Sequence, residues 1–181
     1  MKDTTDSIIP EKVDWGRAYT SLRAFCRTLE NAARSPVTPF ETGDVTPEEE
    51  GSDMKRHEIR TCVLGLPCGL LTIHSLNIFH NDGNLARLEN AHFSLLARGT
   101  EIQFKCTDLS SWSIQLDGTD LFDDDRNVFA PQLQEVLSTL NDEFTTKLNN
   151  DARLKKAADD AVAAERTAGL RRKFENLLGE K

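Results

Sequence analysis

The sequence predicts an α+β protein with a small antiparallel sheet of about four or five strands, covered by a C-terminal amphipathic helix. An N-terminal helix and a helical C-terminal tail complete the expected fold. Two patterns carry this prediction: apolar residues recur at helical spacing near both ends, and the middle is rich in β-branched and aromatic residues. The predicted strands are also joined by connections too short for parallel crossovers, so they must pair antiparallel.

The first segment, residues 1–34, contains one amphipathic helix that starts after Asp14. Its apolar side chains recur every three or four residues and form one stripe. The main members of this stripe are Trp15, Leu22, Phe25 and Leu29. We expect the stripe to be a packing face rather than a ligand site.

The second segment, residues 35–54, contains three prolines and many acidic residues, but no Lys or Arg. Such a composition buries too little apolar surface to offset the entropy lost on ordering. The sequence therefore predicts a flexible acidic linker. Across such a linker, the N-terminal helix would dock at a distance or on another molecule.

The third segment, residues 55–150, is predicted to be the α+β core. Its strand-like runs are 59–64, 70–79, 93–97, 102–106 and 112–116. The last two runs alternate strictly between apolar and polar residues, which predicts a sheet with one wet face and one face that needs a cover. Residues 84–91 fit either a helical turn or a ragged strand.

A covering helix is predicted after the acidic loop 117–127, because Pro131 suits a first helical turn. Its apolar stripe consists of Leu133, Val136, Leu137, Leu140, Phe144 and Leu148. Asn149 and Asn150 indicate a weak point or a stop. The last segment, 151–181, is alanine-rich and predicts an extended helix with little area to bury. It carries eight basic against six acidic residues, whereas the rest of the chain has 14 against 24.

Composition excludes several classes of protein. A net charge of -8 and a pI of about 5.0 argue against a protein that grips nucleic-acid phosphates, so direct nucleic-acid binding is not expected. No apolar run is long enough to span a membrane and the N-terminus does not resemble a signal peptide, which predicts a cytoplasmic protein.

The four cysteines form no C-x-x-C pair and are expected to be free thiols. Phosphate-binding glycine loops are absent, and no cofactor is predicted.

Two histidines are the candidate catalytic residues. His74 and His80 lie six positions apart in one predicted strand, which would place them on the same face of the sheet. With Asp82 just beyond the strand, they would supply a base with an orienting carboxylate, or ligands for a metal. No serine stands in the G-x-S-x-G turn that would mark a companion nucleophile.

The acidic loop is the candidate metal site. Asp123, Asp125 and Asn127 match the first three oxygen ligands of a helix-loop-helix calcium site. The match then fails, because Val128 occupies the position of the required glycine and Gln134 that of the bidentate glutamate. An exposed loop, whose carboxylates favour the N-terminus of the following helix, is the preferred interpretation.

The chain has more amphipathic helix than one small sheet can bury, and no convergent catalytic motif. We therefore expect a non-catalytic interaction or scaffold protein that binds a protein partner or a second copy of itself through its helices. The candidate partner-binding residues are Trp15, Leu22, Phe25, Leu29, Leu170, Arg171, Arg172, Phe174, Leu177 and Leu178. One alternative is a metal-assisted hydrolase that uses the histidines or the loop 117–125. Another is an acidic inhibitor of a nucleic-acid-binding protein.

Overall fold

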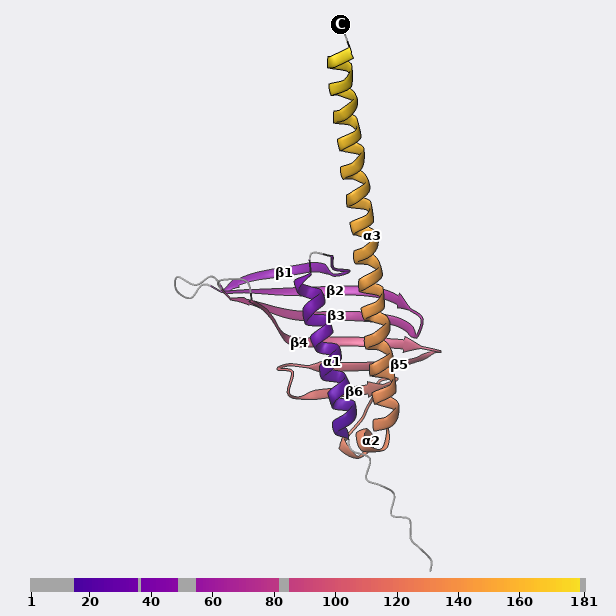
Figure 1. Cartoon of the computed structure of the whole chain (residues 1–181). Helices are drawn as coiled ribbons and strands as arrows, with labels where there is room; N and C mark the ends of the chain where they lie inside the picture. Colours follow the sequence, from indigo (N-terminus) through magenta and orange to yellow (C-terminus); the bar gives the residue numbers. More distant parts are fainter. Residues whose placement is uncertain (1–14, 36, 49–54, 82–84, 180–181) are drawn as a thin grey trace, which may run out of the picture.

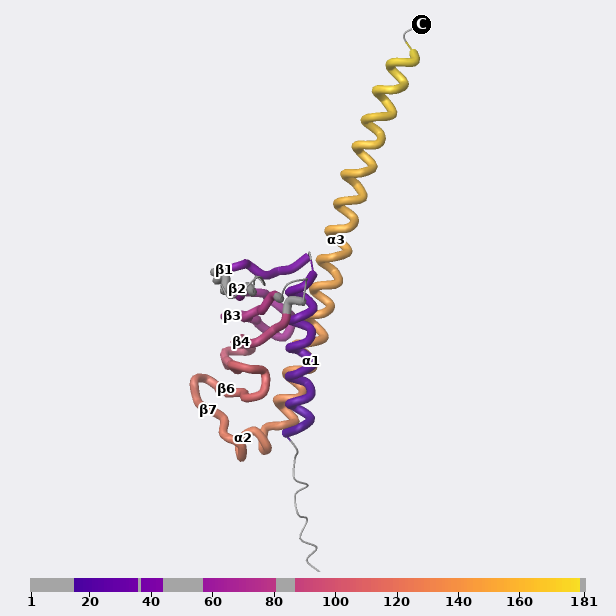
Figure 2. Tube along the Cα trace, turned by 90° about the vertical axis from the view of Figure 1, so that its left-hand side faces the viewer, coloured from indigo at the N-terminus to yellow at the C-terminus, as the bar shows by residue number. Residues whose placement is uncertain are grey.

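Two layers make up the body of the protein in this computed structural model, which describes residues 15–35, 37–48, 55–81 and 85–179. One layer is a seven-stranded antiparallel sheet. The other consists of helices α1 (Trp15–Arg34) and α3 (Ala130–Gly179), which lie side by side on one face of the sheet (Figures 1 and 2). The predicted α+β class and antiparallel sheet are confirmed.

The sheet is a meander in which each strand pairs with the next one along the chain. The strands are β1 (Glu41–Glu48), β2 (Lys55–Leu66), β3 (Gly69–Asn81), β4 (Leu85–Ala97), β5 (Thr100–Cys106), β6 (Trp112–Leu116) and β7 (Thr119–Asp120). Strand β4 includes most of the segment that was ambiguous in the sequence. The sheet exceeds the predicted four or five strands because β1 and β7 extend it at its two edges.

Strand β1 lies within the segment that the sequence predicts to be a flexible linker. It pairs antiparallel with β2, from Glu41 opposite Thr61 to Glu48 opposite Lys55. An edge strand needs only one neighbour, and its unpaired side tolerates the missing N–H of Pro47. The linker interpretation of 35–54 is therefore wrong for residues 41–48, because a neighbouring strand supplies the order that composition alone does not. Residues 49–54 lie outside the described part of the chain.

Two tight turns close the hairpins β4–β5 and β6–β7. Their central residues, Arg98–Gly99 and Asp117–Gly118, all have positive φ angles between 47° and 84°. This is the backbone of a type I′ turn, whose twist matches that of the paired strands and which favours glycine. The pair Asp117–Gly118, assigned to the acidic loop from sequence, is thus a hairpin turn.

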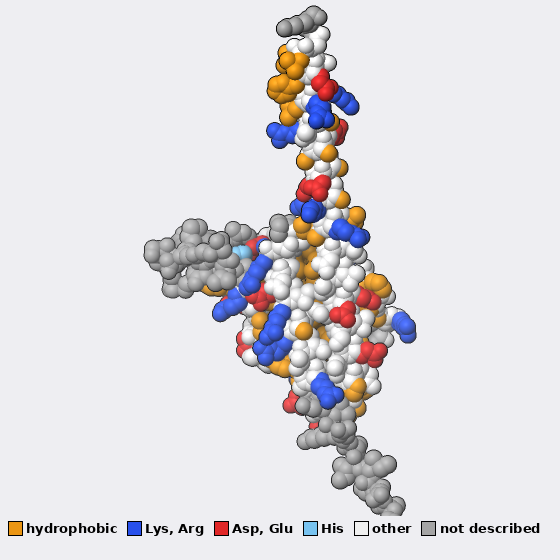
Figure 3. Space-filling model, in the orientation of Figure 1, with side chains coloured by type: hydrophobic (Ala, Val, Ile, Leu, Met, Phe, Trp, Pro, Cys, Tyr) orange, Lys and Arg blue, Asp and Glu red, His pale blue; other side chains and the backbone are white. Residues whose placement is uncertain are grey.

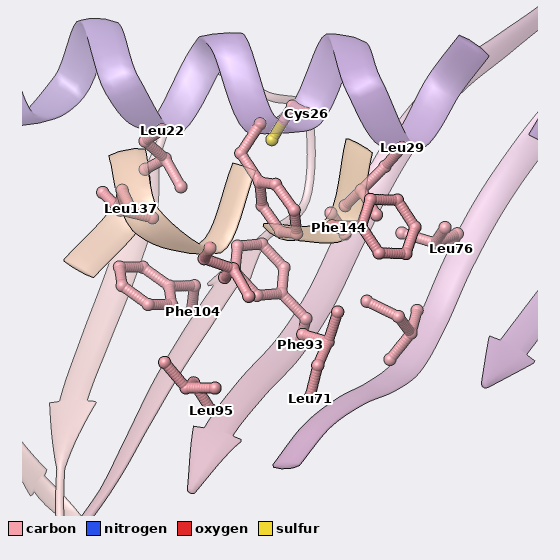
Figure 4. Packing of buried hydrophobic residues seen from close by; sticks show 14 of the residues in the cluster. Leu22, Cys26, Leu29, Leu71, Leu76, Phe93, Leu95, Phe104, Leu137 and Phe144 are labelled. Atoms are coloured by element: carbon pink, nitrogen blue, oxygen red, sulfur yellow. The ribbon is translucent and has the colours of Figure 1, made fainter. Parts of the chain in front are cut away.

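Helix α1 belongs to the core and is not tethered at a distance. Phe25 of α1 contacts Phe93 of β4 edge-on at 5.0 Å between ring centroids, and Phe144 of α3 at 5.8 Å. Phe93 in turn stacks on Phe104 of β5 at 5.0 Å. Figure 4 shows how side chains of α1, α3 and the sheet meet in this cluster. The prediction that α1 docks elsewhere is wrong, because the sheet needs both helices to cover its apolar face.

The two helices run in the same direction and are joined by polar contacts. The hydroxyl of Thr28 donates to Asn141 Oδ1 at 2.6 Å, and the hydroxyls of Ser21 and Ser138 lie 3.3 Å apart. These contacts advance together along both helices, as a parallel pair requires. The helices are therefore fixed to each other as well as to the sheet.

Helix α3 continues without interruption across the predicted stop at Asn149–Asn150. The ammonium group of Lys147 lies 2.8 Å from both carboxylate oxygens of Asp151, so an i,i+4 ion pair spans the two asparagines. Burial nevertheless ends close to the predicted boundary. From residue 152 onward the side chains are exposed, apart from the half-buried Gly169, and the helix projects about 40 Å from the body at 1.5 Å per residue.

One substitution made at two positions of α3 tests this division of the helix. Phe144→Ala empties a fully buried site and should lower the free energy of unfolding by about 3 to 5 kcal/mol. Phe174→Ala changes a side chain that is 64% exposed and should alter the same quantity by less than about 0.5 kcal/mol. Urea denaturation followed by circular dichroism measures both. An equal change in the free energy of unfolding for the two variants would contradict the assignment of Phe144 to the core.

Candidate functional site

The two candidate catalytic histidines lie on opposite faces of the sheet. Strand β3 has a β-bulge between Ile73 and Ser75, and the extra residue reverses which side chains face the helices. His74 lies on the outer face, where its Nε2 is 2.9 Å from Ser94 Oγ. His80 lies on the helix-facing side, bonded to the buried Glu58. The expectation of a shared face is wrong, and Asp82 lies outside the described residues.

On the outer face, His74 and Ser94 form a pair that resembles a base and a nucleophile. Hydrogen bonds from Gln103 and Ser94 hold the pKa of Glu101 below its usual range, so Glu101 is ionised at neutral pH. His74 Nε2 and Ser94 Oγ share one hydrogen bond, in which the donor is set by the tautomer of the histidine. A base and a hydroxyl in contact form a catalytic site only with a third group that orients the base and with donors that stabilise an oxyanion. The arrangement is a polar chain across the strands.

Ser94 was not among the predicted site residues, although the alternation of strand 93–97 puts it on the polar face. It is only 2% exposed, because its polar neighbours cover it. The ring of His92 lies 4.4 Å from that of His74. Burial and the nearby charges of His74 and Lys105 lower the pKa of His92, which is therefore neutral at pH 7. These groups stabilise the outer face.

On the opposite face, Glu58 is the centre of a buried ion-pair network. It accepts hydrogen bonds from Arg60 Nε at 2.9 Å and from His80 Nε2 at 2.8 Å. Arg60 also donates to the carbonyl of Ala33 at the C-terminal end of α1. Burial alone would raise the pKa of Glu58, but the hydrogen bonds from Arg60, His80 and Thr42 and the charge of Arg60 lower it. The network joins α1 to strands β2 and β3.

A pH series tests this network. The pKa of Glu58 is lower in the folded than in the unfolded chain. The ionised carboxylate therefore contributes its full share to the free energy of unfolding above the pKa of the unfolded chain, about 4.3. This contribution is lost as the pH falls through the pKa of Glu58 in the folded chain. Glu58→Gln should lower the free energy of unfolding at pH 7 by about 2 to 4 kcal/mol. It should also flatten the loss of stability below about pH 5. Urea denaturation between pH 7 and pH 3 measures both effects.

The exposed carboxylate of Glu175 provides the control for that series. Glu175→Gln should keep the wild-type stability at pH 7 and the wild-type dependence on pH. A Glu58→Gln variant that behaved in the same way would show that the buried network contributes nothing to folding.

The candidate calcium ligands lie on a short helix, α2 (Asp123–Val128), and not in an open loop. Asp123 lies 3.4 Å from Arg126, and Asp125 accepts the backbone N–H of Phe122 at 3.0 Å. Asn127 accepts the backbone N–H of Trp15 at 3.4 Å. The side-chain oxygens of these three residues thus form an ion pair and hydrogen bonds within the protein. Among residues that the structure describes, no group of three or more His, Cys, Asp or Glu side chains is placed to hold a metal ion.

Adding calcium to the protein tests this interpretation. We expect millimolar Ca²⁺ to leave the melting temperature unchanged, because a ligand stabilises a fold only if it binds the folded state more tightly than the unfolded one. Differential scanning fluorimetry with and without the ion measures the difference. A rise of several degrees that Asp123→Asn abolishes would restore the loop as a metal site.

The four cysteines are free thiols, as predicted, and their surroundings disfavour nucleophilic chemistry. Cys68 is the one partly exposed thiol among them. Burial, together with a hydrogen bond and the charge of Glu143, raises the pKa of Cys68 to about 12. Burial also raises the pKa of Cys62 to about 11 and that of Cys26 beyond its ordinary range. Reactive cysteines need the opposite shift, toward a thiolate at neutral pH.

The predicted N-terminal interaction residues are mostly enclosed. Leu22, Phe25 and Leu29 are fully buried against the sheet and α3 and are not available to a partner, which corrects that part of the prediction. Trp15 is half-buried, with the guanidinium of Arg126 5.9 Å from its ring centroid. Sequence reasoning located this stripe but not the intramolecular surface that covers it.

The C-terminal candidates, in contrast, are exposed. We call Leu170, Phe174, Leu177 and Leu178 the tail cluster; their exposed fractions are 48%, 64%, 75% and 80%. Apolar side chains gather along one side of the protruding end of α3, with basic and acidic side chains beside them (Figure 3). None of the described helices combines the length and apolar character needed to cross a bilayer. The tail cluster is thus an unpartnered apolar surface on a charged helix.

A second apolar feature lies at the opposite end of α3 and was not predicted. We call it the base pocket, a cavity of about 240 Å³ between the start of α3 and the β4–β5 side of the sheet. It is lined by Leu95, Ala97, Thr100, Ile102, Leu116, Leu121, Phe129, Gln132, Leu133 and Val136. The signal for it in the sequence is weak, because its residues come from five separate stretches of chain.

Comparison of the chain with protein-family models, curated proteins and solved structures finds no match. The function of the chain is therefore inferred from its geometry alone. The histidines lie apart and the carboxylates of α2 serve local structure, whereas the tail cluster and the base pocket are accessible apolar surfaces.

Proposed function

We propose that this is a non-catalytic interaction protein that binds a protein partner through the end of helix α3. The observation that supports it is the tail cluster, an exposed apolar stripe at the end of a helix that leaves the body. Helical apolar surface of this kind is normally covered by a groove or by another helix. No other described part of the chain covers it.

The spacing of the tail cluster supports binding along one helix face. Leu170, Phe174, Leu177 and Leu178 stand at i, i+4, i+7 and i+8, the positions that one side of a helix presents to a groove. Arg171 and Lys173 flank this stripe, whereas Arg172 lies on the opposite side of the helix. An acidic rim around an apolar groove would complement this combination.

The body gives the tail a fixed direction. The first half of α3 is held by the buried side chains of Leu137, Leu140 and Phe144, and the helix continues without a break to Gly179. Most helical stability in proteins comes from packing of an apolar face, so anchoring half of α3 in the core favours order in the rest. The binding face is thereby presented away from the sheet.

The hydrolase alternative has no specific support from the described residues. His74 and His80 face opposite sides of the sheet, where His74 contacts Ser94 and His80 contacts the buried Glu58. A reaction would require these groups to converge on one substrate atom. The interaction function requires only the surface described above.

A double substitution tests the proposal. Phe174→Gln with Leu178→Gln removes the apolar side chains and keeps good helix formers. We expect the variant to lose self-association, measured by sedimentation velocity, and the partners captured by chemical cross-linking. Its helicity and melting temperature should not change, since neither side chain is buried.

Leu154→Gln with Val162→Gln is the matched control, because both are exposed apolar residues on the same helix but outside the tail cluster. This control should retain every association of the wild type. If the tail-cluster variant also retained them, the C-terminal end of α3 would not be the binding element.

A further inference from the structure

We propose that the occupant of the tail cluster is a second copy of this chain, whose base pocket receives it, so that chains join head to tail. This inference rests on the proposed function and adds to it the identity of the partner and the surface that it uses. The observations that carry it are the chemistry of the pocket, the charges around the two surfaces and the length of α3.

The base pocket has the size and chemistry to receive side chains from a helix. At about 240 Å³ it is smaller than the roughly 300 to 1,000 Å³ of a typical small-molecule site. Its floor includes the buried side chains of Ile102, Leu121 and Leu133, whereas Leu116 and Phe129 are 37% and 41% exposed. Leucine or phenylalanine side chains from a helix would cover these two residues.

Charges on the two surfaces are complementary. Asp117 follows Leu116 of the pocket, Asp120 precedes Leu121, and Asp124 is exposed on the adjacent helix α2. Arg171 and Lys173 flank the apolar stripe of the tail cluster on its two sides. The acidic residues on the β6–β7 and α2 side of the pocket are therefore matched by basic side chains beside the stripe, which favours this orientation of docking.

A chain cannot fill its own pocket. Leu133 of the pocket and Phe174 of the tail cluster belong to one continuous helix and lie about 60 Å apart at 1.5 Å per residue. Figures 1 and 2 show the start of α3, beside α2, and the C-terminus at opposite ends of the molecule. Only another copy can bring these two surfaces of this chain together.

The resulting interface uses different surfaces on its two sides. Such a heterologous contact leaves one free pocket and one free tail on every open assembly, so chains add until a ring closes or a filament grows. A tail that paired with another tail would instead use the same surface twice and stop at a dimer. The two modes are separable by mixing variants.

The experiment combines two variants that each lack one side of the interface. The tail variant carries Phe174→Gln and Leu178→Gln, and the pocket variant carries Leu116→Gln and Phe129→Gln, which are partly exposed and not core residues. The wild type should form assemblies larger than dimers in sedimentation velocity. Each variant alone should associate at least about tenfold more weakly. Their equimolar mixture should form 1:1 dimers, because one intact tail meets one intact pocket.

A second pocket variant keeps the test independent of folding. Asp124→Lys changes an exposed charge, and should weaken wild-type assembly and remove part of its dependence on salt. It should leave the melting temperature within a few degrees of the wild type.

Three outcomes would overturn the inference. A monomeric wild type at the highest attainable concentration would exclude a second copy as the occupant, while cross-linked partners lost in the tail variant would still support the proposed function. A pocket variant that assembles like the wild type, beside a tail variant that does not, would indicate tail-to-tail pairing. A tail variant that assembles like the wild type would reject both the inference and the proposed function.

Discussion

The packing of Phe25 between the sheet and α3 is the contact on which the rest of the structure depends. A meander of this kind has one apolar face, and that face must be covered to exclude water. Phe25 of α1 touches Phe93 on the sheet and Phe144 on α3, so a single aromatic side chain joins all three parts of the core. Because α1 occupies this position, the first half of α3 is enclosed. The side chains of its second half are exposed, and no described part of the chain packs against them.

Helix α3 therefore has two roles that follow from one difference in composition. Its first half carries large apolar residues and forms core, whereas the following stretch is rich in alanine and charge and offers little area to bury. The apolar residues return only at the far end, in the tail cluster. The base pocket lies beside the first turns, and the helix separates these two apolar surfaces by most of its length. This separation makes contact between copies the natural way to cover both.

The polar groups that resemble catalytic or metal-binding residues instead form hydrogen bonds and ion pairs that stabilise the fold. Glu58, Arg60 and His80 tie α1 to the sheet, and His74, Ser94 and Glu101 cross-link neighbouring strands on the outer face. In both groups the hydrogen-bonding capacity is used within the protein. The carboxylates of α2 likewise serve a helix end and an ion pair. The tail cluster and the base pocket, in contrast, are accessible apolar surfaces at the two ends of α3.

Local patterns in the sequence determined the two long helices, α1 and α3, five of the strands and their antiparallel pairing, because periodicity and short connections depend on neighbouring residues alone. They also located the exposed tail, since an alanine-rich face cannot bury much area in any fold. They did not indicate the short helix α2, whose residues were expected to form a loop. The pair Asp117–Gly118 is typical of a hairpin turn, but the acidic residues around it favoured its assignment to a loop. Tertiary structure alone decided the rest. The bulge that separates His74 from His80, the pairing of β1, the burial of Leu22 and Phe25, and the base pocket all depend on contacts between residues far apart in the chain, which no local pattern contains.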